Sequence, residues 1–320
     1  MSADRIRALV TGATGYIGGR LAPRLLDRGY DVRALARNPD KLAGVPWRDR
    51  VDVARGDLAD AASLRTAFDG VDVVYYLVHS MGTSSDFVAA EAAAARNVVA
   101  AATDSGVRRL VYLGGLHPSG AQLSEHLRSR TAVGEMLIES GIETVVLQAG
   151  IVVGAGSASF EMLRHLTQRL PAMTTPKWVH NKIQPIAIDD VLHYLAEAAT
   201  ADVPKSRTWD IGGPDVLEYG DAIQGYAAVA GLRRRFIVVL PFLTPAIASL
   251  WVGLVTPMPS GLARPLVESL ECDAVMGDHD VDSVIAPPPG GLTGYRDAVA
   301  KALQHGPLPT DPRWAHVGRG

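Results

Sequence analysis

Cysteine is almost absent from this 320-residue sequence, and neither sign of charge dominates it. The one thiol, Cys272, excludes a disulfide framework and a thiolate metal site within one chain. An unpaired cysteine is typical of a reducing compartment, so we expect a cytoplasmic protein. The 31 lysines and arginines against 34 acidic residues give a net charge of -3, which predicts no nucleic-acid partner. A hydrophobic content of 48% excludes intrinsic disorder.

Long uninterrupted hydrophobic runs are also missing. The apolar run at 6–10 contains Arg7 and is too short for a signal peptide. Residues 236–263 carry no charge, but prolines divide them. The longest intact piece, 246–256, would rise only about 16 Å as a helix, against a bilayer core of about 30 Å. We therefore expect no spanning helix.

Apolar strands alternate with helical patterns up to about residue 150, and glycines separate them. This alternation predicts βαβ units and a doubly wound parallel α/β sheet of about seven strands, with a small C-terminal cap region. Expected strands are 7–10, 31–36, 51–54, 71–78, 110–113, 144–147, 183–188 and 208–211; expected helices include 17–28, 86–105, 131–140 and 160–170.

Three parts are expected along the chain. Residues 1–215 form a nucleotide-binding domain with a substrate-region insertion near 155–182, and residues 216–305 form the cap. The last part, 306–320, is rich in proline and glycine, which predicts a flexible tail.

The uncharged stretch 236–263 has three open interpretations. Thr244 and Pro245 are good helix starters, and the helix that follows at 246–256 would be apolar nearly all round. It is a lid over a hydrophobic substrate pocket, or a peripheral membrane contact with the arginines 233–235 on lipid headgroups, or an ordinary core or homodimer helix.

The strongest motif is a glycine-rich loop, TGATGYIG, over residues 11–18. It directly follows the first strand and opens the first helix, which is the context that dinucleotide binding requires. Gly12 permits the tight turn, Gly15 lets the backbone approach a pyrophosphate, and Gly18 allows close helix–strand packing. The free N–H groups and the helix dipole then favour phosphate.

The residues after the second and third strands bear on which nucleotide binds. The second strand ends without an acidic residue for a ribose 2′-hydroxyl, and Arg37 follows it. A guanidinium suits a 2′-phosphate, so we expect NADP(H) in preference to NAD(H). Asp57 and Leu58 follow the third strand, where they meet the adenine or, alternatively, Asp57 caps the next helix.

These residues resemble the short-chain dehydrogenase/reductase superfamily, and most closely its atypical, NmrA-like NAD(P)H-binding proteins. Besides the glycine loop, the resemblance rests on five segments: 56–58 (GDL), 73–78 (VVYYLV), 148–154 (QAGIVVG), 185–191 (PIAIDDV) and 210–214 (DIGGP). Some members of a similar bacterial subgroup carry a further C-terminal domain, and 311–314 stands where its linker would begin, so a truncated chain is one interpretation. The resemblance implies a cofactor pocket lined by Gly12, Thr14, Gly15, Tyr16, Ile17, Gly18, Arg37, Asp57, Leu58, Val78, His79, Ala149, Gly150 and Ile151.

The family's usual proton relay is missing. Active members use Tyr-x-x-x-Lys and a serine at the preceding strand end, but here the matching places read His126, Arg130 and the glycines 114–115. A histidine can donate a proton near neutral pH, whereas an arginine can only position or polarise. We therefore take His126, Arg130 and His79 as candidate catalytic residues, with His117 and Ser119 as weaker ones. No histidine has metal-ligand spacing.

Two functions remain open. The first is an NADPH-dependent oxidoreductase that transfers hydride directly to a small apolar carbonyl or quinone-like substrate, a reaction that needs no strong side-chain acid. The second is a non-catalytic NADP(H)-binding redox sensor or accessory protein of a membrane-associated complex.

Overall fold

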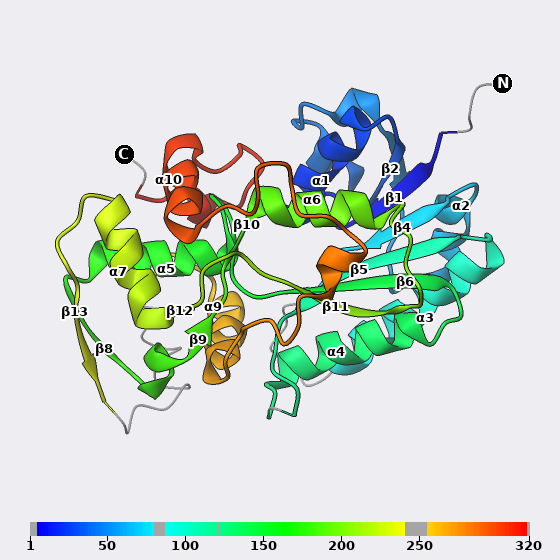
Figure 1. The fold of residues 1–320 in the computed structure, drawn as a ribbon. Coiled ribbons are helices and arrows are strands. Elements are labelled where there is room, and N and C mark those ends of the chain that lie inside the picture. The colour runs from blue at the N-terminus through cyan, green and yellow to red at the C-terminus, as the bar shows by residue number, and fades with distance from the viewer. Residues whose placement is uncertain (1–4, 80–86, 121, 241–254, 319–320) are drawn as a thin grey trace.

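A seven-stranded parallel sheet organises the larger part of the molecule (Figure 1). The structure is a computed structural model that describes residues 5–79, 87–120, 122–240 and 255–318. The strand order is β3-β2-β1-β4-β5-β6-β11, and every neighbouring pair is parallel. The strands are β1 (Arg7–Thr11), β2 (Asp31–Ala36), β3 (Asp52–Arg55), β4 (Val73–Tyr76), β5 (Arg109–Gly115), β6 (Glu143–Ala149) and β11 (Arg207–Ile211). The expected doubly wound fold is confirmed.

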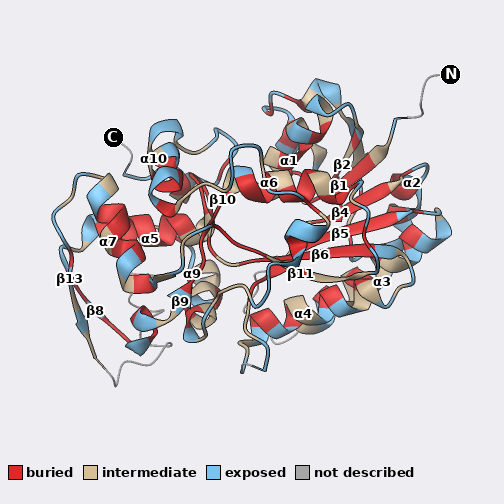
Figure 2. Ribbon diagram, viewed as in Figure 1, coloured by how far each residue is buried: buried red, intermediate tan, exposed pale blue. Residues whose placement is uncertain are grey.

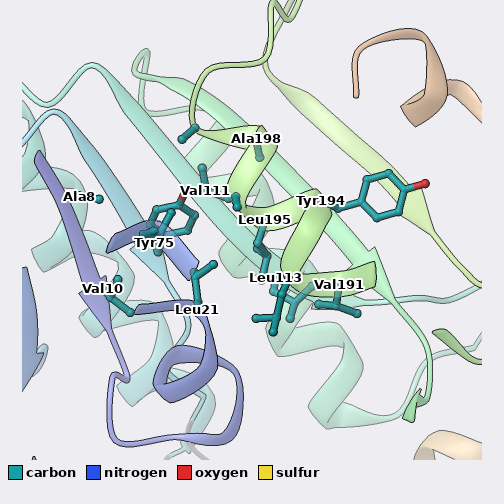
Figure 3. Packing of buried hydrophobic residues seen from close by; sticks show 14 of the residues in the cluster. Ala8, Val10, Leu21, Tyr75, Val111, Leu113, Val191, Tyr194, Leu195 and Ala198 are labelled. Atoms are coloured by element: carbon teal, nitrogen blue, oxygen red, sulfur yellow. The ribbon is translucent and has the colours of Figure 1, made fainter. Parts of the chain in front are cut away.

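Helices cover both faces of this sheet, so its central strands β1, β4, β5 and β6 are buried on each side, whereas the edge strand β3 is not (Figure 2). In β5, Val111 and Leu113 face one core with α1 (Tyr16–Asp27) and α6 (Ile188–Ala198). Leu110 and Tyr112 face the other core, which is covered by α2 (Ala61–Phe68), α3 (Phe87–Asp104) and α4 (Glu125–Ile138). Figure 3 shows the first core. Burial on both faces explains why these strands are almost continuously apolar.

A proline inside α1 is compensated by a side chain. Pro23 has no N–H to donate to the carbonyl of Gly19, four residues earlier. The indole nitrogen of Trp47 donates to that carbonyl instead, at 3.0 Å. The loop between β2 and β3 is thereby held on the helix that follows the glycine-rich loop.

A second core lies beside the sheet, in the part of the chain that follows β6. Its helices are α5 (Ala158–Arg169), α7 (Tyr219–Val229), α9 (Ser260–Glu268) and α10 (Tyr295–His305). Three short strand pairs join it: β7 (Val152–Val153) with β10 (Ile186–Ala187), β9 (Lys182–Ile183) with β12 (Leu217–Glu218), and β8 (Ala172–Thr175) with β13 (Phe236–Val239). Single 3-10 turns stand at Pro39–Leu42, Arg48–Arg50, Lys177–His180, Ser269–Glu271 and Asp280–Ser283.

Some predicted elements differ from those observed. The expected strand 183–188 is divided into β9 and β10, and α6 begins at Ile188. The pair β8–β13 was not expected. The predicted helix at 246–256 lies mostly outside the described residues. No helix among the described ranges is both long and apolar enough to cross a bilayer.

The tail predicted to be flexible instead packs against the molecule. We call residues 308–318 the C-terminal strap; it includes α11 (Arg313–His316). Asp311 is buried and accepts two hydrogen bonds from Arg20 of α1, at 2.9 and 2.6 Å. Arg164, fully buried in α5, donates to the carbonyl of Val317 at 2.8 Å. Buried charges need such partners, so the strap is a fixed part of the fold.

Candidate functional site

The glycine-rich loop forms an open cradle of backbone donors at the start of α1. Gly12 has a φ of 68°, a conformation that favours glycine, and Gly15 donates its N–H to the carbonyl of Gly12 at 2.8 Å. Gly15 also caps α1 without any side-chain hydrogen bond to the first turn. Thr14 and Gly15 are exposed. The first N–H groups of α1 are therefore accessible to an anion such as a pyrophosphate.

Close packing fixes the position of this cradle. A Cβ atom on Gly18 would stand 2.4 Å from the carbonyl oxygen of Gly12. Glycine has no Cβ atom, so it is the one residue that avoids this clash. On the other side, the hydroxyl of Thr11 donates to the carbonyl of Tyr75 and accepts from the N–H of Leu77, both at 3.0 Å. The loop is thus tied to the end of β4. Val78 and His79 follow there, so the loop and His79 share one edge of the sheet.

Tyr16 is the first residue of α1 and is half-buried. Its ring lies under the guanidinium of Arg20, 4.1 Å away, and its hydroxyl is buried against Gly154. Burial raises the pKa of this phenol far above its usual value, so it stays protonated. Its side chain joins α1 to the segment at Gly154, and its neighbour Ile17 packs against the first core.

Arg37 is exposed directly after β2, and it forms no ion pair within the described residues. The register places Arg55 opposite Ala36, one position before Arg37, so a second cation lies at the same edge. Arg55 was missed in the sequence, although it also ends a strand. The carboxylate of Asp57 accepts from the N–H of Ala59 at 3.0 Å.

The alternative role for Asp57, as a helix cap, is wrong. Asp60 caps α2 by accepting from the N–H of Ala62 at 3.0 Å. Asp57 instead closes the turn after β3. The side chain of Leu58 is buried in the core under α2 and α3.

The segment expected under the nicotinamide follows β6. Ala149 and Ile151 are buried, and Gly150 between them is half-buried. The carbonyl of Ala149 accepts from Leu116, and that of Ile151 accepts from Ile186, both at 2.9 Å. These hydrogen bonds fix the backbone of the segment, in which Ala149 belongs to the first core and Ile151 to the second core.

Arg130, His79 and His126 come together at the carboxyl ends of β4 and β5. Arg130 and His126 are four residues apart on α4 and share a helix face. Nη2 of Arg130 lies 3.2 Å from Nε2 of His79 and donates to the carbonyl of Leu113 at 3.0 Å. Nε of Arg130 is buried and has no hydrogen-bond partner in the described structure. His79 also contacts the edge of the Tyr112 ring, with centroids 5.7 Å apart.

Both histidines are held neutral. Burial, and then the charge of Arg130, lower the pKa of His79 well below its usual value of 6.5. The same two causes lower the pKa of His126 to about 4. His126 is buried rather than a surface residue at a helix start. At pH 7 the positive charge in this cluster therefore belongs to Arg130, and neither imidazole is a ready proton donor.

A serine at Gly115, the second place that matches the family's serine, would require the Leu127 side chain to shift. A Cβ atom on Gly115 would stand 2.7 Å from a methyl carbon of Leu127. The same atom would be 3.8 Å from Nη1 of Arg130. The guanidinium therefore reaches toward the space where the serine would have been.

A second polar cluster lies one strand further along the same edge. Nε2 of His117 is 3.0 Å from the hydroxyl of Thr131 and 3.5 Å from Nε2 of Gln148. Asp210, opposite Gln148 on β11, is close enough to His117 to interact electrostatically. The sequence analysis missed three residues of this cluster. Gln148 and Asp210 lie near the carboxyl ends of β6 and β11, and Thr131 lies on α4. Their positions near strand ends and on the helix that follows β5 are the signal that could have found them. Ser119 is exposed and outside this cluster.

Two hollows elsewhere do not coincide with this edge. One of about 810 Å³ lies between α7 and α10, and one of about 600 Å³ lies beside the loop 288–294. The first is lined by charges of both signs, including Asp221, Arg234 and Asp297. Neither hollow contains a residue of the glycine loop or of the histidine–arginine cluster.

Comparisons with known proteins agree with this geometry. A family model described as NAD(P)H-binding matches residues 12–163. Cinnamoyl-CoA reductase 1 of Oryza sativa subsp. japonica is 40% identical over 111 residues, which is 32% of each chain. The matches thus span about a third or less of the first curated relatives' own length.

Two solved structures share the fold over nearly the whole chain. Triphenylmethane reductase of Citrobacter sp., complexed with NADP(H), has a TM-score of 0.71 and 21% identity over 93% of this chain and 100% of its own. An NADPH-dependent quinone oxidoreductase from Escherichia coli, complexed with NADPH, has a TM-score of 0.71 and 20% identity over 92% of this chain and 98% of its own.

The fold, the glycine loop and the family match define a Rossmann-type NAD(P)H-binding protein. Residues 12–163 match the NAD(P)H-binding family model, and the motifs of the chain resemble those of the atypical, NmrA-like short-chain dehydrogenase/reductases.

The close approach at Gly18 generates a test of the cradle. Gly18→Ala forces the methyl group against the backbone oxygen of Gly12, so the loop must shift. We expect a loss of about 1–3 kcal/mol in the free energy of unfolding and at least tenfold weaker NADPH binding. Chemical denaturation and calorimetric titration measure the two effects. Gly44→Ala, where nothing lies within 4 Å, is the control. Unchanged NADPH affinity in Gly18→Ala would place the cofactor elsewhere.

The depressed pKa of His126 predicts how stability depends on pH. The unfolded chain takes up a proton near pH 6.5, but the folded chain does so only near pH 4. Stability is therefore lost as the pH falls between these values, by up to about 3 kcal/mol from this residue. His126→Gln should make the unfolding free energy fall less steeply over that range, where the buried His79 and His165 continue to contribute; His279→Gln, at an exposed position, is the control. An equally steep profile in His126→Gln contradicts the burial of a neutral imidazole.

Proposed function

We propose that the protein is an NADPH-dependent reductase of a small apolar carbonyl or quinone-like acceptor, with a quinone favoured. The observation that carries the proposal is the cluster at the ends of β4 and β5, which joins one arginine to two neutral histidines. Such a site offers a fixed positive charge but no strong acid. It suits an acceptor whose reduced form is stable as an anion.

The cradle fits a dinucleotide phosphate. The N–H groups in the first turn of α1, just after Gly15, would hold the pyrophosphate, and Arg37 would contact a 2′-phosphate, with Arg55 at the same edge. When bound, reduced nicotinamide supplies a hydride to the acceptor.

Arg130 would then act on the acceptor's oxygen or on the ribose. Its buried, unpartnered Nε and its Nη1 are the donors left after Nη2 has bonded to Leu113. A quinone that gains a hydride becomes a hydroquinone anion, and the negative charge is delocalised over the ring. That anion is stabilised by the guanidinium and then takes its proton from water. A simple ketone would need a proton donor during the transfer, which neutral His126 supplies poorly.

The missing relay also favours a second candidate function. Without the family's tyrosine and lysine, the same cradle could serve a non-catalytic NADP(H) sensor. The two functions differ in one measurement, since only the reductase consumes NADPH when menadione is added.

The catalytic proposal predicts unequal roles for the two residues on α4. With menadione and NADPH, Arg130→Met should lower kcat/KM about 100-fold because the developing anion loses its donor. His126→Gln should stay within about threefold, and kcat should be nearly constant from about pH 5.5 to 8. Calorimetric titration with NADPH separates lost turnover from lost cofactor binding. If His126→Gln is as damaging as Arg130→Met, the imidazole is a catalytic acid and the proposal of protonation by water is wrong.

The cofactor preference predicts a selective effect at Arg37. Arg37→Ala should weaken NADPH binding about tenfold or more and leave NADH binding nearly unchanged, because only NADPH carries the 2′-phosphate. Arg65→Ala, an exposed arginine on α2, controls for overall charge. Tighter binding of NADH than of NADPH to the unaltered protein would reverse the preference.

A further inference from the structure

The strands β8 and β13 form a two-stranded parallel ribbon at the far edge of the second core, away from the seven-stranded sheet (Figure 1). We call it the outer ribbon. Each strand pairs only with the other among the described residues. One face packs inward: Met173, Ile237 and Val239 contact the second core.

The other face of the outer ribbon is open and apolar. The register pairs Phe236 with Ala172 and Val238 with Thr174, and all four side chains are exposed. Phe236 is 68% exposed, more than any other large hydrophobic residue described. An exposed aromatic ring beside an exposed valine is costly in water and is typical of a contact surface.

Cations flank this face. Arg169 ends α5 just before β8, Arg233 stands just before β13, and Lys177 follows β8; all three are exposed and form no ion pair within the described residues. Because the strands are parallel, Arg169 and Arg233 lie near the same end of the ribbon, where Phe236 donates to the carbonyl of Pro171 at 3.0 Å. Arg169 also donates to the carbonyl of Val255.

Two of the arginines predicted to contact headgroups are placed differently. Arg235 is buried, and its backbone forms two hydrogen bonds with Gln224. Arg234 borders the hollow that contains Asp221 and Asp297. The cations available to a partner of the outer ribbon are therefore Arg169, Lys177 and Arg233.

We propose that the outer ribbon docks the protein on an anionic membrane surface. Phe236 and Val238 enter the headgroup layer, and Arg169, Lys177 and Arg233 contact lipid phosphates. An apolar centre with a cationic rim is complementary to that surface, whose outer layer is negative and whose interior is apolar. The contact does not depend on the proposed reductase activity, so either proposal can fail alone.

The test is sedimentation of the unaltered protein with vesicles of equimolar phosphatidylglycerol and phosphatidylcholine. We expect binding that weakens as salt is added and that is lost with pure phosphatidylcholine. Phe236→Ser should lower the partition coefficient about tenfold, and Arg169→Gln with Arg233→Gln about 25-fold, since each cation near the surface contributes about fivefold.

Matched variants elsewhere make the result specific. Val216→Ser removes another exposed hydrophobic residue, and Arg65→Gln with Arg96→Gln removes two exposed cations from α2 and α3. These controls should bind as the unaltered protein does. No binding at low salt, or equal losses in the controls, overturns the proposal.

A second copy of the chain is the competing occupant of the ribbon. If the protein is a dimer that Phe236→Ser converts to a monomer, and the vesicles do not bind it, the ribbon is an interface between copies and the membrane proposal is wrong. NADPH titration of each variant checks that the fold is intact, because the ribbon lies outside the cradle.

Discussion

The close contact between Gly18 and the Gly12 carbonyl is the constraint on which the rest of the molecule depends. It brings the start of α1 directly onto the end of β1, where the Thr11 hydroxyl joins the loop to β4. From that fixed point α1 reaches the segment after β7 through Tyr16, whose hydroxyl lies at Gly154, and Arg20, which donates to the carbonyl of Ala155. A glycine is required because the two backbones touch, so a side chain of any size would separate phosphate cradle and sheet.

Arg130 has a comparable role at the neighbouring strand ends. One guanidinium bonds to a main-chain carbonyl, contacts His79 and adds its charge to the burial that lowers the pKa of two imidazoles. Tyr112 donates to the main-chain carbonyl of Arg130 at 3.1 Å, which fixes that turn of α4. The electrostatics of the site therefore come from a permanent cation in a partly buried place, not from a titrating pair. This arrangement favours the binding of anionic or electron-rich groups over the delivery of protons.

The sequence was sufficient for the parallel sheet and the glycine loop, because both have strong local signals: β-branched runs, helical spacing and glycines at required positions. The contact between His79 and Arg130 was predictable in part. His79 follows the carboxyl end of β4, and Arg130 lies on α4, the helix that follows the neighbouring strand β5. The neutrality of His126 was not, because it depends on burial by residues distant in the chain. The division of the expected strand at 183–188 could not be predicted either. Its apolar run is shared between two short strands, β9 and β10, which pair with β12 and β7 respectively.

The C-terminal strap could not be predicted from composition, because its prolines and glycines are those of a loose tail. Asp311 bonds to Arg20, 291 positions earlier in the chain, and Arg20 also donates to the carbonyls of Tyr16 and Ala155. Contacts of such sequence separation form late in folding. On the ribosome, the helix that opens the cradle is therefore made 291 positions before the carboxylate that pairs with it. Until Asp311 is synthesised, the guanidinium of Arg20 lacks this partner, so the surroundings of the cradle are completed only after the sheet and the second core have been made.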